Sequence, residues 1–157
     1  MDPGRKNVDD TALVTTRLML PQDANVAGNV FGGVILKNID EAAALVAFRH
    51  ARKNVVTASM DRMDFYAPVY VGDILILRVA VNYVGSTSME IGVRVEAENR
   101  LTGESVHTGS AYLTYVALDE EGKPDSIPKV KPVTKDERRR YVEAKLRRKH
   151  RLIKRNR

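Results

Sequence analysis

Apolar and polar residues alternate along most of the second half of the chain, which is the pattern of strands in a half-buried sheet. The segment 89–98 alternates most regularly, with apolar side chains on one face and mostly charged ones on the other. Other segments have the length or the β-branched content of strands: 11–20, 55–63 with a continuation toward Gly72, 73–84 and 104–118. Pro21 should end the first of these, and the connection at 100–103 has the composition of a hairpin turn. The pattern therefore predicts consecutive long antiparallel strands.

Residues 34–48 show a different pattern, an apolar run of good helix formers without a broad polar face. We predict a helix here that is enclosed on most of its sides. The loop before it contains Gly28, Gly32 and Gly33, which should make it flexible. Asp40 interrupts the apolar run near its middle, and a buried carboxylate is costly unless it has partners or a function. Asp40 is therefore the most informative residue of this segment.

A second helix is predicted from about Thr134, where Thr134 and Glu137 fit a capping box. Its apolar stripe is thin, so we expect it to pack at its start and to fray at its end. The preceding segment, 119–132, is rich in turn residues and marks the end of the compact body.

These elements predict an α+β fold with one antiparallel sheet and a single central helix. We divide the chain into a disordered N-terminus at 1–10, one domain at 11–128 and a basic helical extension at 129–157. One helix cannot cover both faces of such a sheet, so we expect a second subunit to do so and the protein to be at least a homodimer. A chain of 157 residues is most simply one domain, so a sizeable substrate site is expected to be shared between subunits.

The net charge of +6 is distributed unevenly. Residues 129–157 carry fourteen Lys or Arg and three acidic residues, a net charge of +11, which leaves −5 for the first 128. A basic tail suits nucleic acid, anionic lipid or the phosphates of a ligand, although a run of charge is more often a solvated helix face. Cysteine is absent, no segment has the composition of a membrane span and the first ten residues lack the apolar core of a signal peptide. We therefore expect a cytoplasmic protein.

The residues needed for several common types of catalysis are missing from the sequence. His50, His107 and His150 are not spaced as metal ligands with carboxylates beside them, so we expect no metal. His50 is explained by its place at the end of the first predicted helix, where a positive group is favourable. The nucleophile elbow of serine hydrolases, a cysteine nucleophile and the glycine motifs of nucleotide-binding folds are all missing.

What remains is Asp40 and the glycines at the start of its helix. The first turn of a helix has unpaired N–H groups, and Gly32 and Gly33 would let a substrate carbonyl approach them closely. Asp40, about two turns further on, could then act on a water molecule or on the carbonyl carbon. Alternatively, the glycines only permit a tight loop and Asp40 forms a salt bridge with Lys37 or with a neighbouring subunit. The residues alone leave both interpretations open.

Separated motifs, in order, resemble the acyl-CoA thioesterases of the hotdog fold, in particular the cytosolic brain-type acyl-CoA hydrolases and their bacterial relatives. They cover residues 12–118 and comprise DANVAGNVFGG at 23–33, Leu36-Lys37, Asp40-Glu41-Ala42, VTASMD at 56–61, Phe65, Pro68-Val69, Gly72-Asp73, Ser88-Met89-Glu90 and Thr102-Gly103-Glu104. The resemblance implies a hotdog fold, in which an antiparallel sheet wraps a long helix and two chains form a continuous double sheet, commonly as a trimer of dimers.

The resemblance also implies hydrolysis of fatty acyl-CoA to a free fatty acid and CoA, with no cofactor because CoA is part of the substrate. Asp40 would be the general base or the nucleophile, Asn25 of the partner subunit would position water or substrate, and Gly33 would contribute its amide. By similarity, the CoA groove would be lined by residues from three parts of the chain: Gly32, the segment Ser59 to Arg62, and the turn Gly85, Ser86, Thr87 and Ser88. Phe31 stands where many brain-type relatives have histidine, so no acid or base is expected there.

Two alternatives use the same fold. One is a non-catalytic acyl-CoA-binding or regulatory protein whose basic tail contacts nucleic acid, although no RNA platform or helix-turn-helix pattern supports nucleic-acid binding. The other is a hotdog dehydratase, which we rank lower because those relatives generally place a histidine in the active loop or helix and none lies between Asn25 and Arg49.

Overall fold

The computed structural model describes residues 4–157 and contains a sheet of long strands with one helix on each side. In chain order, the elements are β1 (Arg5–Asn7), the 3-10 helix η1 (Val8–Asp10), β2 (Leu13–Leu18), the 3-10 helix η2 (Pro21–Asp23), α1 (Gly32–Ala51), β3 (Asn54–Phe65), β4 (Asp73–Val84), β5 (Ser88–Asn99), β6 (Ser105–Leu118), β7 (Lys129–Lys131) and α2 (Lys135–Arg155).

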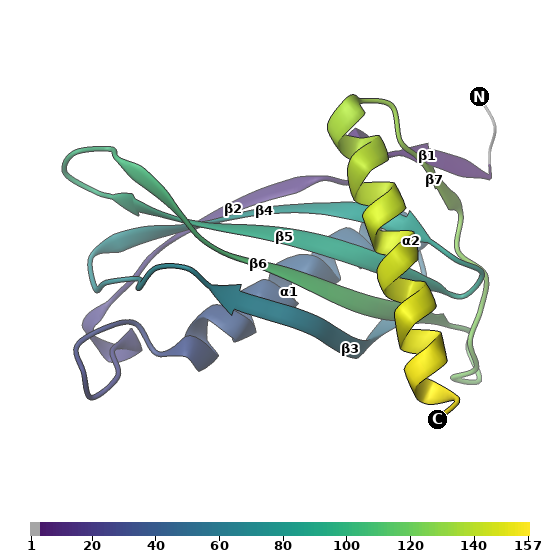
Figure 1. Cartoon of the computed structure of the whole chain (residues 1–157), viewed down its shortest axis with the longest axis horizontal. Helices are drawn as coiled ribbons and strands as arrows, with labels where there is room; N and C mark the ends of the chain where they lie inside the picture. Colours follow the sequence, from purple (N-terminus) through teal and green to yellow (C-terminus); the bar gives the residue numbers. More distant parts are fainter. Residues whose placement is uncertain (1–3) are drawn as a thin grey trace.

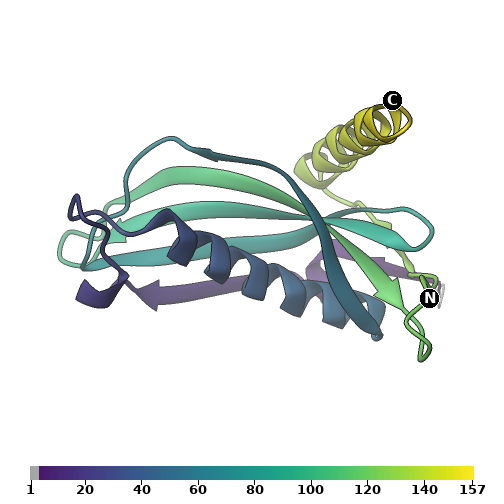
Figure 2. The same cartoon turned by 90° about the horizontal axis from the view of Figure 1, so that it is seen from below.

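Five strands form an antiparallel sheet in the order β2-β4-β5-β6-β3. The sheet curves around α1, and α2 crosses its opposite, convex face (Figures 1 and 2). This is the predicted α+β layout, a long helix held in an antiparallel sheet. The strands β4, β5 and β6 carry the predicted alternation, and their inward side chains are almost fully buried: Leu75, Leu77, Val79, Val81, Ile91, Val93, Val95, Ala111 and Leu113.

The strand β3 is the least regular of the long strands. It lies at one edge of the sheet and, within residues 4–157, pairs with β6 alone. Its register with β6 shifts twice, between Thr57 and Ser59 and again between Met60 and Arg62. Each shift is a β-bulge, in which one extra residue turns the following side chains to the other face. The chain then leaves the sheet at Phe65, so the predicted continuation toward Gly72 is a loop.

The helix α1 packs on the sheet through a face of small and branched side chains. Ile39, Ala43, Val46 and Ala47 are completely buried. Leu45 and Phe48, on its other side, are 52% and 43% exposed. The prediction that the helix is enclosed on most sides is therefore wrong for a single chain, because one sheet covers only one face of it.

The N-terminus differs from the prediction. Residues 1–3 lie outside the described part of the chain, but Arg5–Asn7 form β1, which pairs in parallel with β7. The following turn, η1, places Val8 in the core. The expected disorder at 1–10 is therefore wrong for residues 5–10, because pairing with a strand about 120 residues further along the chain orders them.

The helix α2 begins at the predicted capping box. The Thr134 hydroxyl accepts a hydrogen bond from the Glu137 amide (3.1 Å), and the Glu137 carboxylate accepts one from the Thr134 amide (3.0 Å). Ala144 is completely buried against the sheet, and the rings of Tyr141 and Tyr83 meet edge to face. The helix continues to Arg155. No helix among the described residues is both long and apolar enough to cross a membrane.

Candidate active site

Asp40 lies on the side of α1 that faces β3 and β6, and two hydroxyl groups hold its carboxylate. Thr57 of β3 donates a hydrogen bond to Oδ1 (2.8 Å), and Tyr115 of β6 donates one to the same oxygen (2.6 Å). The Tyr115 hydroxyl is also 2.9 Å from the backbone carbonyl of Asp40. None of these bonds involves Oδ2. The arrangement fixes one oxygen of the carboxylate and leaves the other for water or substrate.

Tyr115 is a permanent hydrogen-bond donor in this site. The residue is 1% exposed, and burial, followed by the hydrogen bond with Asp40, raises the pKa of its hydroxyl. Ionisation would place a second negative charge beside the Asp40 carboxylate, which the low-dielectric surroundings make unfavourable. Tyr115 therefore stays protonated at neutral pH and cannot serve as a base.

Neither Thr57 nor Tyr115 was predicted from the sequence to have a function. These residues are 58 positions apart and come together because they face each other in the β3–β6 ladder. The matching motif at 56–61 contains Thr57, so the segment was recognised but this side chain was not. Nothing in the local sequence around Tyr115 distinguishes it from an ordinary buried tyrosine.

Asn25 lies in the loop before α1 and closes that loop. Its side-chain oxygen accepts hydrogen bonds from the amides of Ala27 (2.9 Å) and Asn29 (3.1 Å). Because the oxygen is engaged, the amino group is the part of this side chain that is available to a ligand. Gly28 completes the turn with a positive φ of 88°, which favours glycine.

The two glycines at the start of α1 differ in their surroundings. A Cβ atom on Gly33 would lie 2.6 Å from Cε1 of Phe31, whereas one on Gly32 would meet nothing within 4 Å. A side chain at position 33 would therefore displace the Phe31 ring. Phe31 itself is 57% exposed.

A cavity of about 340 Å³ opens beside this end of α1. It contains Asn25 and Gly32 and is otherwise mainly apolar, with Val30, Ile35, Phe65, Pro68 and Val69 among its lining residues. Asp40 does not line it. Gly33 and Asp40 are seven residues apart on one helix, which corresponds to roughly 11 Å along the axis. The glycines and the carboxylate of one chain therefore do not meet at one substrate carbonyl.

Two of the residues predicted to contact CoA lie on the other face of the sheet. Thr57 and Tyr115 face α1. Ser59 pairs with Thr114, and Thr114 pairs with Glu90. Glu90 contacts α2, so these three side chains point to the convex face. Arg62 is also on this convex side, where its Nε is 2.6 Å from Asp64. The structure therefore does not bring Ser59 or Arg62 together with Asp40 in one chain.

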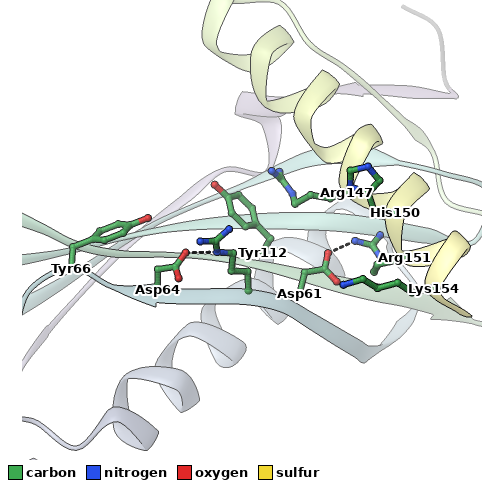
Figure 3. Close-up of a pocket in the computed structure, with 9 residues that line it drawn as sticks. Asp61, Asp64, Tyr66, Tyr112, Arg147, His150, Arg151 and Lys154 are labelled. Carbon is green, nitrogen blue, oxygen red and sulfur yellow. Dashed lines mark hydrogen bonds and ion pairs between the residues drawn. The ribbon is translucent and has the colours of Figure 1, made fainter.

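Arg62 lines a groove of about 590 Å³ between β3 and α2. Side chains from the strands meet side chains from the helix in this groove, as Figure 3 shows. The helix contributes Arg147, His150, Arg151 and Lys154. The cations are partly neutralised within the groove by carboxylates of β3.

The predicted turn of Gly85, Ser86, Thr87 and Ser88 connects β4 to β5 near the C-terminal end of α1. The Gly85 amide donates a hydrogen bond to the Ser88 carbonyl (2.8 Å), and the Ser86 carbonyl accepts one from the Ile127 amide (3.1 Å). Two cations of the extension are close to this turn: Lys129 binds the Gly85 carbonyl, and the guanidinium of Arg148 lies 3.3 Å from where a Gly85 Cβ would be. The turn is therefore well separated from Gly33 of the same chain, but it lies in basic surroundings.

His50 does not have the role that we predicted. It is completely buried, its Nε2 is 2.6 Å from the Pro128 carbonyl, and burial lowers the pKa of its ring. A neutral ring is therefore favoured. The positive group at the end of α1 is instead Lys6, which donates to the backbone carbonyls of His50 (2.8 Å) and Arg49 (3.2 Å). Among the described residues, no group of three or more histidine or acidic side chains is placed to hold a metal ion.

Comparison with known proteins gives consistent matches. Residues 27–104 match the model of the thioesterase superfamily. An uncharacterized acyl-CoA thioester hydrolase of Bacillus subtilis is 39% identical over 135 residues, which are 86% of this chain and 78% of that protein.

Two solved structures match almost the whole chain, including α2. A hexameric acyl-CoA thioesterase, solved without ligand, superposes with a TM-score of 0.92 at 46% identity, covering 96% of both chains. An acyl-CoA hydrolase from Staphylococcus aureus, solved with butyryl-CoA and CoA, superposes with a TM-score of 0.91 at 38% identity, covering 96% of this chain and 92% of that one. These matches confirm the predicted hotdog thioesterase fold.

Proposed function

This chain belongs to the thioesterase superfamily, in its acyl-CoA hydrolase branch, and from that premise we propose that it hydrolyses acyl-CoA thioesters to a fatty acid and free CoA. The observation that carries the proposal is the Asp40 carboxylate, which two neutral hydroxyls hold while its second oxygen makes none of the described bonds. A carboxylate that is oriented in this way is equipped to accept a proton or to attack a carbonyl carbon.

In the general-base route, Asp40 accepts a proton from water while the water oxygen attacks the thioester carbonyl carbon. The carbon–sulfur bond then breaks, and CoA leaves as a thiolate that takes up a proton. In the nucleophilic route, Asp40 itself attacks and water cleaves the resulting anhydride, with the same products. Thr57 and Tyr115 serve both routes, because they keep Oδ1 in place and direct Oδ2 toward the substrate.

We propose that each active site uses two chains. Asn25 lies in the loop before α1, and Gly33 lies in the first turn of α1, about 11 Å along the helix from Asp40 of the same chain. If these groups act on one carbonyl, Asp40 must face the Asn25 and Gly33 of a partner subunit. The exposed Leu45 and Phe48 on α1 agree with such a partner, and a hexameric thioesterase is among the structural neighbours. A homo-oligomer, and specifically a trimer of dimers, is therefore part of the proposal.

The S. aureus hydrolase offers independent support. Three of its structures carry single substitutions to alanine, of an asparagine, an aspartate and a threonine. Those three positions are separated by 15 and 17 residues, which is also the spacing of Asn25, Asp40 and Thr57. We therefore assign these three residues to the proposed site.

The CoA contacts remain predictions. The turn Gly85 to Ser88, with Lys129 and Arg148 beside it, is suited to phosphate because its cations supply charge-assisted hydrogen bonds. Ser59 and Arg62 lie on the convex face, so they would reach CoA only where it passes around the edge of the sheet. The mechanism needs no metal or redox cofactor, and the cytoplasmic location also remains a prediction from the sequence.

The first experiment measures release of free thiol from a series of acyl-CoA esters of increasing chain length. We expect Asp40→Asn and Asn25→Ala each to reduce kcat by about a hundredfold or more. A wild-type protein inert toward every ester, or an Asp40→Asn variant with the wild-type rate, would refute the proposed function.

The second experiment tests the shared site by mixing the two inactive chains in one assembly. Half of randomly formed dimers would pair an Asn25→Ala chain with an Asp40→Asn chain, and one of the two sites in such a dimer is intact. Co-expression should therefore restore about a quarter of the wild-type activity, because a two-fold interface exchanges the same residues in both directions. No recovery from a co-purified mixed dimer would place both residues in one chain. Oxygen-18 incorporated into Asp40 during turnover in labelled water would identify the nucleophilic route.

A further inference from the structure

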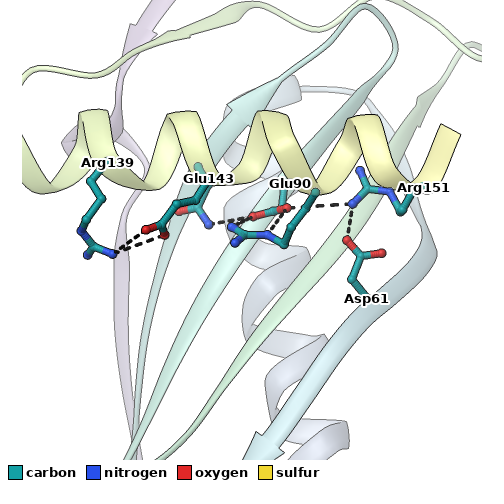
Figure 4. Close-up of polar contacts among 7 residues, drawn as sticks. Asp61, Glu90, Arg139, Glu143 and Arg151 are labelled. Carbon is teal, nitrogen blue, oxygen red and sulfur yellow. Dashed lines mark hydrogen bonds and ion pairs between the residues drawn. The ribbon is translucent and has the colours of Figure 1, made fainter. Parts of the chain in front are cut away.

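The helix α2 is fastened to the sheet by an ion-pair network that ends on β3, the strand that supplies Thr57. Arg147 of α2 makes two hydrogen bonds to Glu90 of β5, at 2.7 and 3.0 Å. One turn further on, Arg151 forms an ion pair with Asp61 of β3 and lies 4.0 Å from Glu90. Figure 4 shows Glu90, Arg151 and Asp61 of this network beside α2. The network therefore spans from β5 to the edge strand.

The network is anchored most firmly at β5. The Glu90 side chain is 1% exposed, and it also accepts a hydrogen bond from Asn82 of β4 (3.0 Å). Arg147 crosses above the ring of Tyr112 on β6, with its guanidinium carbon 3.7 Å from the ring centre. Three central strands thus fix the position of α2, and Arg151 extends that support to β3.

Asp61 lies where β3 most needs support. It is the extra residue of the second bulge, between Met60 and Arg62, and Ala58 is the extra residue of the first. A bulge removes ladder hydrogen bonds and disrupts the pairing locally. Among the described residues of one chain, β6 is the strand that pairs with β3. The two bulges loosen this pairing, and α2 holds the same segment from the convex side.

Thr57 stands directly before the first bulge. Its partner on β6 is Tyr115. At the next position along β6, Thr114 pairs with Ser59 of β3 on one side and with Glu90 of β5 on the other. The Glu90 end of the network is thus one ladder position away from the two hydroxyls that hold Asp40, on the opposite face of the sheet. Asp61 lies further along β3, just beyond the pair of Met60 with Leu113. A displacement of β3 at Asp61 would move Thr57 relative to Asp40.

We propose that Arg151 and Asp61 are positioning residues for hydrolysis: through their ion pair, α2 braces the bulged part of β3 and keeps the Thr57 hydroxyl on the Asp40 carboxylate. This inference rests on the proposed function and adds to it a role for the C-terminal helix. Neither Arg151 nor Asp61 reaches the reacting atoms, because both lie on the convex face.

The test is a double-mutant cycle on kcat. Arg151→Met keeps most of the side-chain stem and removes the charge, and Thr57→Val removes the hydroxyl and keeps the shape. Each single change should lower kcat. Thr57→Val should lower it by about tenfold or more, because it removes a hydrogen bond to a charged group. Arg151→Met should lower it by less, about three- to tenfold, because it only loosens that hydrogen bond. In the Thr57→Val background, Arg151→Met should have no further effect, since Arg151 acts through Thr57.

Three further variants separate positioning from general destabilisation. Asp61→Asn should resemble Arg151→Met, and Arg151→Lys should recover most of kcat because it restores the positive charge. Arg155→Met, one turn further along α2 at an exposed residue outside the network, should behave like the wild type. All are measured below the midpoint of thermal unfolding of each variant, with KM recorded alongside kcat.

Wild-type kcat in Arg151→Met, or an undiminished effect of Arg151→Met in the Thr57→Val background, would overturn the positioning role. Both results would leave the proposed function intact, because loss of activity in Asp40→Asn tests that function separately. If Arg151→Met does not fold, the same cycle with Asp61→Asn decides the question.

Discussion

The Tyr115 hydroxyl offers the most direct check on how the Asp40 carboxylate is held. Tyr115→Phe removes one oxygen atom and keeps the ring that fills the core. The variant loses the 2.6 Å hydrogen bond to Oδ1 and the 2.9 Å bond to the Asp40 carbonyl. Thr57 still binds Oδ1, so the carboxylate keeps one of its two side-chain donors.

The size of the effect follows from these contacts. A hydrogen bond to a charged group contributes about 1.5 to 3 kcal/mol, which corresponds to a change of roughly ten- to a hundredfold in rate if the bond is needed in the transition state. The fold should suffer much less, by about 1 kcal/mol, because the phenyl ring still packs and Asp40 is partly open to solvent. KM should change little, since Tyr115 is buried behind the carboxylate and has no route to the acyl chain or CoA.

The assay is steady-state thiol release, with thermal unfolding measured on the same preparations. Tyr83→Phe is the matched control, because Tyr83 is a sheet tyrosine on the convex face that contacts Tyr141. We expect Tyr115→Phe to lose kcat and Tyr83→Phe to retain it. If Tyr115→Phe keeps the wild-type kcat, the hydroxyl does not orient the catalytic carboxylate, and Thr57 alone would have to do so.

Further predictions concern folding and the active loop. Burial lowers the pKa of the His50 ring in the folded state. As the pH falls, the unfolded chain therefore binds a proton at this residue before the folded chain does. The stability that the neutral His50 ring contributes is complete above its ordinary pKa of about 6.5 and is lost below it. Unfolding at pH 7.5 and 5.5 should therefore show a smaller acid-induced loss for His50→Gln than for the wild type. Arg147→Met should destabilise the fold by about 3 to 5 kcal/mol in denaturant titration, because it leaves the 1% exposed Glu90 carboxylate without its main partner; an unchanged midpoint would contradict this. Gly33→Ala should reduce activity because its Cβ would displace the Phe31 ring, whereas Gly32→Ala has open space; equal rates for the two would show that the Phe31 contact is unimportant.

The parts of the molecule that could be predicted from the sequence are those governed by local pattern. The alternation in β4 to β6 and the apolar run of α1 specify a sheet wrapped around a helix, and Asp40 is conspicuous because it breaks that run. The pairing of β1 with β7 could not be predicted, because both segments are short and polar and gain order only from each other. The exposed side of α1 was also missed, since periodicity does not reveal whether a second chain or the same chain covers a face.

The bulges explain why the site was only half predicted. In a regular strand, Thr57, Ser59 and Asp61 would share one face, because side chains alternate with a period of two. The extra residue at Ala58 turns Ser59 toward the convex face, while Thr57 still faces Asp40. Asp61, two residues after Ser59, then faces the same side and meets Arg151, and the second bulge keeps Arg62 on that side as well. A regular β3 could not present Thr57 to the helix on one side and Asp61 to the helix on the other, so the irregularity of this strand is what couples the two faces of the sheet.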